Sequence, residues 1–300
     1  MLRTRLVAAT VMTALFAGGM WADLVYFRDS IMLHAMFLVA AYLSFREFWP
    51  LCRATGHQTF SNWGTLSGCA LVAVHYWSMH LCSSPGATTV AWQRATNMSL
   101  AALAAAILGA FLLTARRHQL QASLGGVAVT CLGLLYIYFL PSFLLKLRHV
   151  GPNGLIGGSG WNSFGHHMVV ATVVLAKGCD VWAYLIGRLL GRHKAFPTLS
   201  PGKTVEGIVA GVVGSVAVAA VLSLQSVGVL SRFGLGKACV IGLCLAIAGI
   251  MGDLAESLLK RSAGAKDAGN VVPGYGGAMD VVDSLMVAGP VAYFLIPAML

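Results

Sequence analysis

Charged residues are scarce in this sequence: only 10% of its 300 residues are Asp, Glu, Lys or Arg, whereas 58% are hydrophobic. Soluble globular domains carry roughly 25% charged residues, so this composition excludes a soluble globule. The mean hydropathy of +0.78 agrees with that exclusion. We expect an all-α, polytopic integral membrane protein, because each spanning helix needs about 20 mainly apolar residues.

Cysteine pairs at metal-ligand spacing are also missing. The seven cysteines form no CxxC motif, and most of them lie in or beside apolar stretches. This pattern is typical of buried small hydrophobic side chains and predicts neither a disulfide framework nor a zinc site. A Walker loop is absent too, because Gly202-Lys203-Thr204 has Pro197 where the motif needs its first glycine.

Apolar runs occur about nine times, at residues 6–22, 31–45, 64–81, 98–114, 124–144, 167–186, 205–224, 238–254 and 281–300. The first run follows two arginines, as in a signal peptide, but Met20 and Trp21 are too bulky for a small-residue cleavage site. We therefore expect about nine transmembrane helices, the first of them uncleaved.

The net charge of +10 is best interpreted by position along the chain, and it does not indicate a nucleic-acid partner. With nine spans, the side that holds the N-terminus and the segment 252–284 receives thirteen Lys and Arg residues. The opposite side receives six: Arg28, Arg94, Lys146, Arg148, Arg232 and Lys237. The positive-inside rule then places the N-terminus and 252–284 in the cytoplasm.

Acidic residues are rare before residue 180, where only Asp23, Asp29 and Glu47 occur. We interpret Glu47, which follows Arg46 just past the second span, as a paired surface charge. Asp180 lies in an apolar run three residues after Lys177, and an ionisable group at bilayer depth costs roughly 2.5–3.5 kcal/mol. Such a residue indicates a functional site, a structural Lys177–Asp180 ion pair, or a position near the interface.

Charge is densest in the stretch 252–284, GDLAESLLKRSAGAKDAGNVVPGYGGAMDVVDS. Asp253, Glu256 and Lys260 would lie within roughly 60° of one another on a helix. Asp280 and Asp283 would share a face of the following helix, and the glycine-rich turn 273–277 between the helices lets backbone approach a ligand. Carboxylates, cations and such a turn suit a divalent metal that holds phosphates.

A second polar segment, 187–207, ends in SPGKTVEG. We expect Ser200 and Pro201 to form a turn and Gly202 to give the backbone conformational freedom. Lys203 and Thr204 then offer a cation and a hydroxyl where a helix begins, and a helix N-terminus favours anions.

Together these motifs resemble the CDP-diglyceride synthase family, also called phosphatidate cytidylyltransferases, which are multi-spanning membrane enzymes. The family signature is S-x-x-K-R-x4-K-D-x-G-x3-P-G-H-G-G-x-x-D-R-x-D. The residues that match it are Ser257, Lys260, Arg261, Lys266, Asp267, Gly269, Pro273, Gly274, Gly276, Gly277, Asp280 and Asp283. Asp180, Gly187-Arg188 and the S-P-K-K-T-x-E-G pattern from Ser200 match upstream, so the resemblance covers the chain from about residue 180. Three positions depart from it: Tyr275 replaces the His, Val281 the second Arg, and Gly202 the first Lys of S-P-K-K-T.

The resemblance implies a site and its ligands. Asp253 and Asp280 would bind Mg²⁺, alone or with a second cation, and Glu256, Asp267 and Asp283 would be alternative or supporting ligands. The catalytic residues would be Lys203, Lys260, Arg261, Lys266 and Asp283. The substrate-binding residues would be Ser200, Thr204, Asp180, Asp267, Gly274, Tyr275, Gly276 and Gly277. The implied substrates are CTP and phosphatidic acid in the bilayer.

The same resemblance suggests a homodimer. The bacterial type of the sequence suggests the cytoplasmic (inner) membrane, and the positive-inside rule has the site face the cytoplasm. About five N-terminal transmembrane helices would occupy residues 1–150, and the catalytic transmembrane region residues 151–300.

Two other classes of function stay open. One is a related CTP-dependent lipid enzyme, such as a polyprenol kinase or another lipid cytidylyltransferase. The other is a non-enzymatic paralogue or a transporter, although transporters often show repeated halves with broken helices, and no such repetition occurs here.

Overall fold

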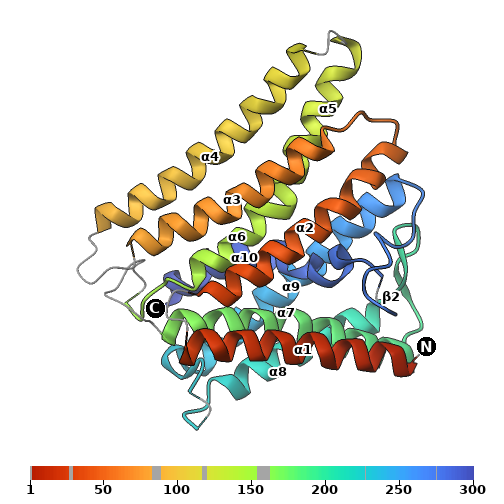
Figure 1. Ribbon diagram of the computed structural model, residues 1–300. Helices are drawn as coiled ribbons and strands as arrows, with labels where there is room; N and C mark the ends of the chain where they lie inside the picture. The colour runs from red at the N-terminus through yellow and green to blue at the C-terminus, as the bar shows by residue number, and fades with distance from the viewer. Residues whose placement is uncertain are drawn as a thin grey trace. The chain divides into compact units, whose positions relative to one another are not determined.

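The computed structural model describes residues 2–26, 30–82, 89–116, 120–153, 163–226, 228–274 and 276–300. Their helices are α1 (Leu2–Val25), α2 (Ile31–Ala54), α3 (Ser61–Cys82), α4 (Thr89–Arg116), α5 (Leu120–Gly133), the π-helix η1 (Leu134–Phe139), α6 (Leu140–Leu147), α7 (Ser163–Leu190), α8 (Val205–Leu222), the 3₁₀-helix η2 (Ser231–Phe233), α9 (Gly234–Ser262) and α10 (Ala278–Met299). The strands β1 (Lys194–Phe196) and β2 (Ser200–Thr204) pair antiparallel. Figure 1 shows this arrangement.

Within these ranges, eight helical segments are long and apolar enough to cross a membrane. The remaining expected span, 64–81, coincides with α3, which has 22 residues and is not among the eight. The predictions of an all-α, multi-pass membrane protein and of about nine spans are therefore confirmed. The expected span 238–254 forms only part of α9, because the helix continues through the charged residues to Ser262.

The chain forms two compact units that are discontinuous in sequence. The first contains the described residues up to Ser142 together with Ser262–Val281, and the second contains those from Phe143 to Arg261 together with Val282–Leu300. The units are defined by packing, so the expected functional division at residue 150 stays a prediction.

In the first unit, aromatic side chains of α2 form much of the core. Phe45 and Phe48 are fully buried, and a Cβ added to Gly133 would lie 2.8 Å from the Phe48 ring. The start of α2 is held by Asp23, whose carboxylate accepts hydrogen bonds from the N–H groups of Met32 (2.9 Å) and Leu33 (2.8 Å). A buried carboxylate is a strong acceptor for the N–H groups that a helix start leaves unpaired.

In the second unit, α7 and α8 pack at close range (Figure 1). A Cβ added to Gly207 would lie 2.7 Å from the carbonyl oxygen of Ala183, and one added to Gly211 would lie 2.8 Å from that of Cys179. Ser215 of α8 then donates to the carbonyl oxygens of Leu175 in α7 (3.1 Å) and Gly242 in α9 (3.2 Å). Glycine and serine thus allow three helix backbones to approach one another.

The segment before α8 differs from the prediction. Residues 197–199 form the turn, and Ser200 and Pro201 lie in β2, with Phe196 paired to Ser200 and Lys194 to Thr204. The expected turn at Ser200–Pro201 was therefore wrong. Proline lacks an N–H but is tolerated in an edge strand, and Pro197 is well suited to begin a turn.

Candidate active site

Three carboxylates of the second unit converge. Asp253 and Glu256 of α9 and Asp283 of α10 each contribute one oxygen atom, and these atoms lie within 4.8 Å of one another. The convergence depends on Gly252, where a Cβ would meet the backbone of Asp283 and lie 2.9 Å from the Cα of Ser284. Glycine at this position thus allows α10 to bring Asp283 beside α9.

Each of these carboxylates is paired with a lysine, and the three lysines come from α7, β2 and α9. The Nζ atom of Lys177 in α7 lies 2.8 Å from Oδ1 of Asp283, and that of Lys203 in β2 lies 2.8 Å from Oδ2 of Asp253. Within α9, Nζ of Lys260 lies 2.7 Å from Oε2 of Glu256. Glu256 is only 1% exposed and Asp283 6%, and buried carboxylates of this kind need such pairing to be stable.

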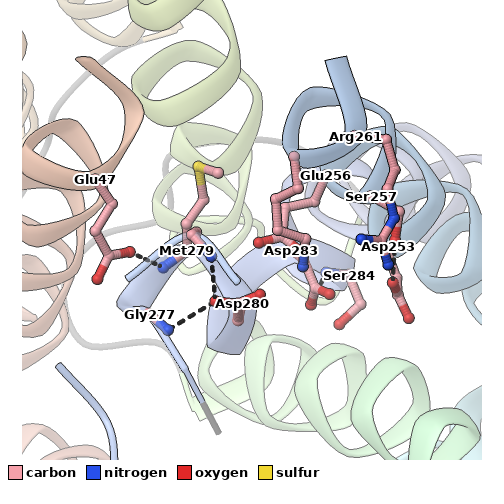
Figure 2. Close-up of polar contacts among 12 residues, drawn as sticks. Glu47, Asp253, Glu256, Ser257, Arg261, Gly277, Met279, Asp280, Asp283 and Ser284 are labelled. Carbon is pink, nitrogen blue, oxygen red and sulfur yellow. Dashed lines mark hydrogen bonds and ion pairs between the residues drawn. The ribbon is translucent and has the colours of Figure 1, made fainter. Parts of the chain in front are cut away.

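Asp180 belongs to the same network, since its Oδ2 atom lies 3.6 Å from Nζ of Lys177. The Lys177–Asp180 ion pair considered from the sequence is therefore present, and Asp283 joins it. Ser257 adds a long contact, with its hydroxyl 3.4 Å from Oδ1 of Asp253 (Figure 2).

The β-hairpin carries Lys203 and is held at three points. The hydroxyl oxygen of Thr204 caps α8 by accepting the N–H of Gly207 (3.2 Å). The Glu206 carboxylate accepts the N–H of Arg192 (3.1 Å), and Nε of Arg261 donates to the carbonyl oxygen of Leu199 (3.1 Å). These bonds tie the hairpin to α8 and to the end of α9.

In the first unit, Asp280 organises the glycine-rich turn. Its Oδ2 atom accepts the N–H group of Gly277 (2.7 Å), as Figure 2 shows, and that of Ala268 (3.1 Å). Gly274 and Gly276 have φ angles of +83° and +108°, which L side chains rarely adopt, so the turn requires glycine at both positions. Tyr275 lies outside the described residues.

Glu47 is a buried residue that the sequence interpretation missed. It is only 6% exposed, so the interpretation as a surface charge was wrong. Its Oε1 accepts the N–H of Ala278 (2.8 Å) and its Oε2 that of Met279 (2.9 Å), as Figure 2 shows for the latter. Cβ atoms added to Gly269 or Gly277 would collide with this carboxylate. The sequence did contain one indication of this role. Glu47 lies at the end of an apolar span, where an ionised carboxylate costs free energy unless it is paired.

The predicted site residues fall into two groups. Asp180, Ser200, Lys203, Thr204, Asp253, Lys260, Arg261 and Asp283 belong to the second unit, and Lys266, Asp267, Gly274, Gly276, Gly277 and Asp280 to the first. Lys266 and Asp267 are exposed. Because Asp253 and Asp280 belong to different units, their pairing as metal ligands stays a prediction.

The carboxylates of the second unit fit a divalent cation. Mg²⁺ takes oxygen ligands at 2.0–2.1 Å, which puts opposite ligands about 4.2 Å apart. The three oxygen atoms lie within a comparable span, and the carboxylates that carry them are partly or fully buried. Asp253, Glu256 and Asp283 are therefore the residues that would hold the ion, with lysines around them to contact anionic groups.

The fold and the site together define a multi-pass membrane protein with a carboxylate–lysine centre. The profile of the cytidylyltransferase family matches residues 3–299, which is nearly the whole chain. The chain belongs to the cytidylyltransferase family.

Curated relatives agree with this assignment. A Synechocystis protein named phosphatidate cytidylyltransferase is 34% identical over 60% of this chain and 65% of its own length. One of the same name from Bacillus subtilis is 34% identical over 57% of this chain and 58% of its own length. An Escherichia coli protein named only as uncharacterized protein YnbB is 36% identical over 43% of this chain and 42% of its own length. The matches thus span about two fifths to two thirds of these relatives.

Proposed function

We propose that this protein is a phosphatidate cytidylyltransferase, which transfers CMP from CTP to phosphatidic acid and produces CDP-diacylglycerol and pyrophosphate. The observation that carries the proposal is the cluster of Asp253, Glu256 and Asp283, each paired with a lysine. The names of the Synechocystis and Bacillus subtilis relatives support the choice of lipid substrate.

The proposed reaction is a substitution at phosphorus. A phosphate oxygen of phosphatidic acid forms a bond to the α-phosphorus of CTP, and the bond from that phosphorus to the oxygen bridging to the β-phosphate breaks. Pyrophosphate leaves with the electron pair of the broken bond. The nucleophile is already ionised, so the barrier comes mainly from charge repulsion and positioning rather than from removal of a proton.

The residues of the chain would lower that barrier by charge and by geometry. A bound Mg²⁺ would neutralise phosphate charge, held by Asp253, Glu256 and Asp283. Lys203 and Lys260 already lie beside these carboxylates, so their ammonium groups can stabilise charge that develops on pyrophosphate. We assign Arg261 and Lys266 the same role. Asp280 would complete the metal site, as the family resemblance implies.

Substrate positioning would come from the glycine-rich turn and the hairpin. Gly274 and Gly276 would let the backbone approach the nucleotide, and we assign Tyr275, Gly277 and Asp267 to the same binding role. Ser200 and Asp180 would contact the substrate, while Thr204 fixes the start of α8. The acyl chains of phosphatidic acid would stay in the bilayer. We place the protein in the cytoplasmic (inner) membrane with this site facing the cytoplasm.

A second candidate is a CTP-dependent lipid kinase or a cytidylyltransferase for another lipid. It is favoured by Tyr275 and Val281, which replace the family's His and Arg. A kinase would transfer the γ-phosphate of CTP, whereas a cytidylyltransferase would transfer the α-phosphate.

The test uses the purified protein in detergent with Mg²⁺, phosphatidic acid and CTP labelled at either the α- or the γ-phosphate. We expect label in the lipid product only from α-labelled CTP, and we expect Asp253→Asn and Asp280→Asn to abolish it. Label from γ-labelled CTP, tested also with polyprenol as acceptor, would establish the kinase instead. Activity that appears only in a Tyr275→His, Val281→Arg double variant would refute the proposal for the natural chain.

A further inference from the structure

Lys177 lies inside the carboxylate cluster although the motif-based site did not include it. Its Nζ atom contacts Oδ1 of Asp283 at 2.8 Å and Oδ2 of Asp180 at 3.6 Å. Lys177 precedes Asp283 by 106 positions, so the contact joins α7 to α10. The Lys177 side chain is 30% exposed and that of Asp283 only 8%, which limits screening of the interaction by solvent.

The charges of the cluster are nearly balanced without any metal. Four carboxylates, those of Asp180, Asp253, Glu256 and Asp283, meet three ammonium groups, those of Lys177, Lys203 and Lys260. Ionised, they leave a net charge of −1. A divalent cation brought to these carboxylates is therefore repelled by ammonium groups already in contact with them.

The three lysines differ in their relation to the site. Lys260 pairs with Glu256 within one helix, four residues apart, and Lys203 is carried by the hairpin. Lys177 instead contacts two carboxylates, that of Asp180 in its own helix and that of Asp283 in α10. Like the partners of the other two lysines, Asp283 also offers an oxygen to the three-carboxylate cluster. An ammonium group and a metal ion would thus compete for the same carboxylate.

We propose that Lys177 is a positioning residue that holds Asp283 and Asp180 in place and competes with the divalent cation for Asp283. The cation then binds weakly until the phosphates of a nucleotide bring additional negative charge. By reciprocity, the cation and the nucleotide strengthen each other's binding. The inference rests on the proposed function, because it takes the three-carboxylate cluster as the metal site.

The test measures Mn²⁺ binding to the purified full-length protein in detergent, from the electron paramagnetic resonance signal of free Mn²⁺. Without nucleotide, we expect Lys177→Met to bind Mn²⁺ at least about tenfold more tightly than the wild type, which corresponds to about 1.4 kcal/mol. Lys177→Arg, which keeps the charge, should stay near the wild-type affinity. CTP should increase Mn²⁺ affinity less in Lys177→Met than in the wild type.

Lys237→Met is the matched control, because it removes one positive charge of the same unit from a lysine whose ammonium group donates to the carbonyl oxygen of Met299 (2.6 Å). It should leave Mn²⁺ affinity unchanged, and an equal gain in this variant would attribute the effect to net charge and overturn the proposal. An unchanged or weaker Mn²⁺ affinity in Lys177→Met would also overturn it.

Gel filtration and thermal unfolding establish that each variant is folded, and Lys177→Gln replaces Lys177→Met under the same tenfold criterion if the latter does not fold. Formation of CDP-diacylglycerol is assayed separately. Its absence would refute the proposed function, whereas the Mn²⁺ affinities alone decide the role of Lys177.

Discussion

Glu47 and Met279 lie 232 positions apart in the chain, and Oε2 of Glu47 accepts a 2.9 Å hydrogen bond from the backbone N–H of Met279. The other carboxylate oxygen accepts the N–H of Ala278. Helix α2 therefore determines where α10 begins, and α10 carries both Asp280 and Asp283. The N-terminal part of the chain thus contributes directly to the start of the helix that carries Asp280.

We predict that Glu47→Gln lowers the free energy of unfolding by about 1–3 kcal/mol, because the amide nitrogen cannot accept one of the two buried N–H groups. It should also lower kcat/KM for CTP, because the turn before α10 loses its anchor. Thermal unfolding and the α-label transfer assay measure the two effects.

Asp23→Asn is the matched control, since Asp23 accepts two N–H groups at the start of α2 in the same way. It should destabilise the protein comparably and leave the KM for CTP unchanged. Equal kinetic effects in the two variants would show that Glu47 acts through stability alone.

We predict that Asp283→Asn weakens Mn²⁺ binding at least about tenfold, equivalent to about 1.4 kcal/mol, because it removes one of three converging carboxylates. Glu206→Gln, which neutralises a carboxylate that accepts backbone N–H groups just before the hairpin, serves as the control. Asp280→Asn measured alongside decides whether Asp280 is also a ligand. An unaltered Mn²⁺ affinity in Asp283→Asn would remove Asp283 from the metal site.

We predict that Lys260→Met costs about 3–5 kcal/mol of stability, because it leaves the buried carboxylate of Glu256 without its ammonium partner. Lys203→Met should cost only about 1 kcal/mol, since the Asp253 side chain is 26% exposed and water can replace the lysine. Unfolding by heat in detergent ranks the two variants. The reverse ranking would contradict the role of burial.

We predict that Gly211→Ala destabilises the packing of α7 and α8 by about 1–3 kcal/mol, because the new methyl group would lie 2.8 Å from the carbonyl oxygen of Cys179. Gly178→Ala is the control within α7, where no heavy atom in the described structure outside the local helix backbone lies within 4 Å of the added Cβ. It should be neutral or stabilise by up to about 1 kcal/mol. Unfolding temperatures compare the pair, and equal temperatures would contradict close packing.

We predict that the β-hairpin faces the cytoplasm. In a cysteine-free background, Thr198→Cys in the exposed hairpin turn should react with a membrane-impermeant maleimide only in inside-out vesicles. Arg232→Cys, expected on the opposite side, should react only in intact spheroplasts. The reverse pattern would invert the topology.

The sequence predicted much of the fold because a membrane span is a local property, readable from some 20 consecutive residues. It predicted the ends of the helices less well. Helix α9 continues to Ser262 because Leu, Glu, Lys and Arg favour helix even where hydropathy falls. The hairpin was missed because its strands are short and contain proline and glycine, which favour turns in most contexts.

The site was predictable where its residues share a motif. Lys260 and Asp283 fall in one signature, Asp253 lies four residues before its start, and Lys203 falls in another. Glu47 and Lys177 were not assigned to it because their partners are distant along the chain: the N–H groups of Ala278 and Met279, and the carboxylate of Asp283. No local pattern marks such contacts, since they arise only when helices pack.

The two carboxylates beside Lys177 also differ in when they are synthesised. Asp180 is three residues away and reaches the membrane with Lys177 in the same helix, whereas Asp283 is added 106 residues later. During translation, Lys177 can therefore be neutralised within α7 before any later helix exists. The 2.8 Å contact with Asp283 can form only once α10 has packed against α7, so this ion pair forms late in the assembly of these helices.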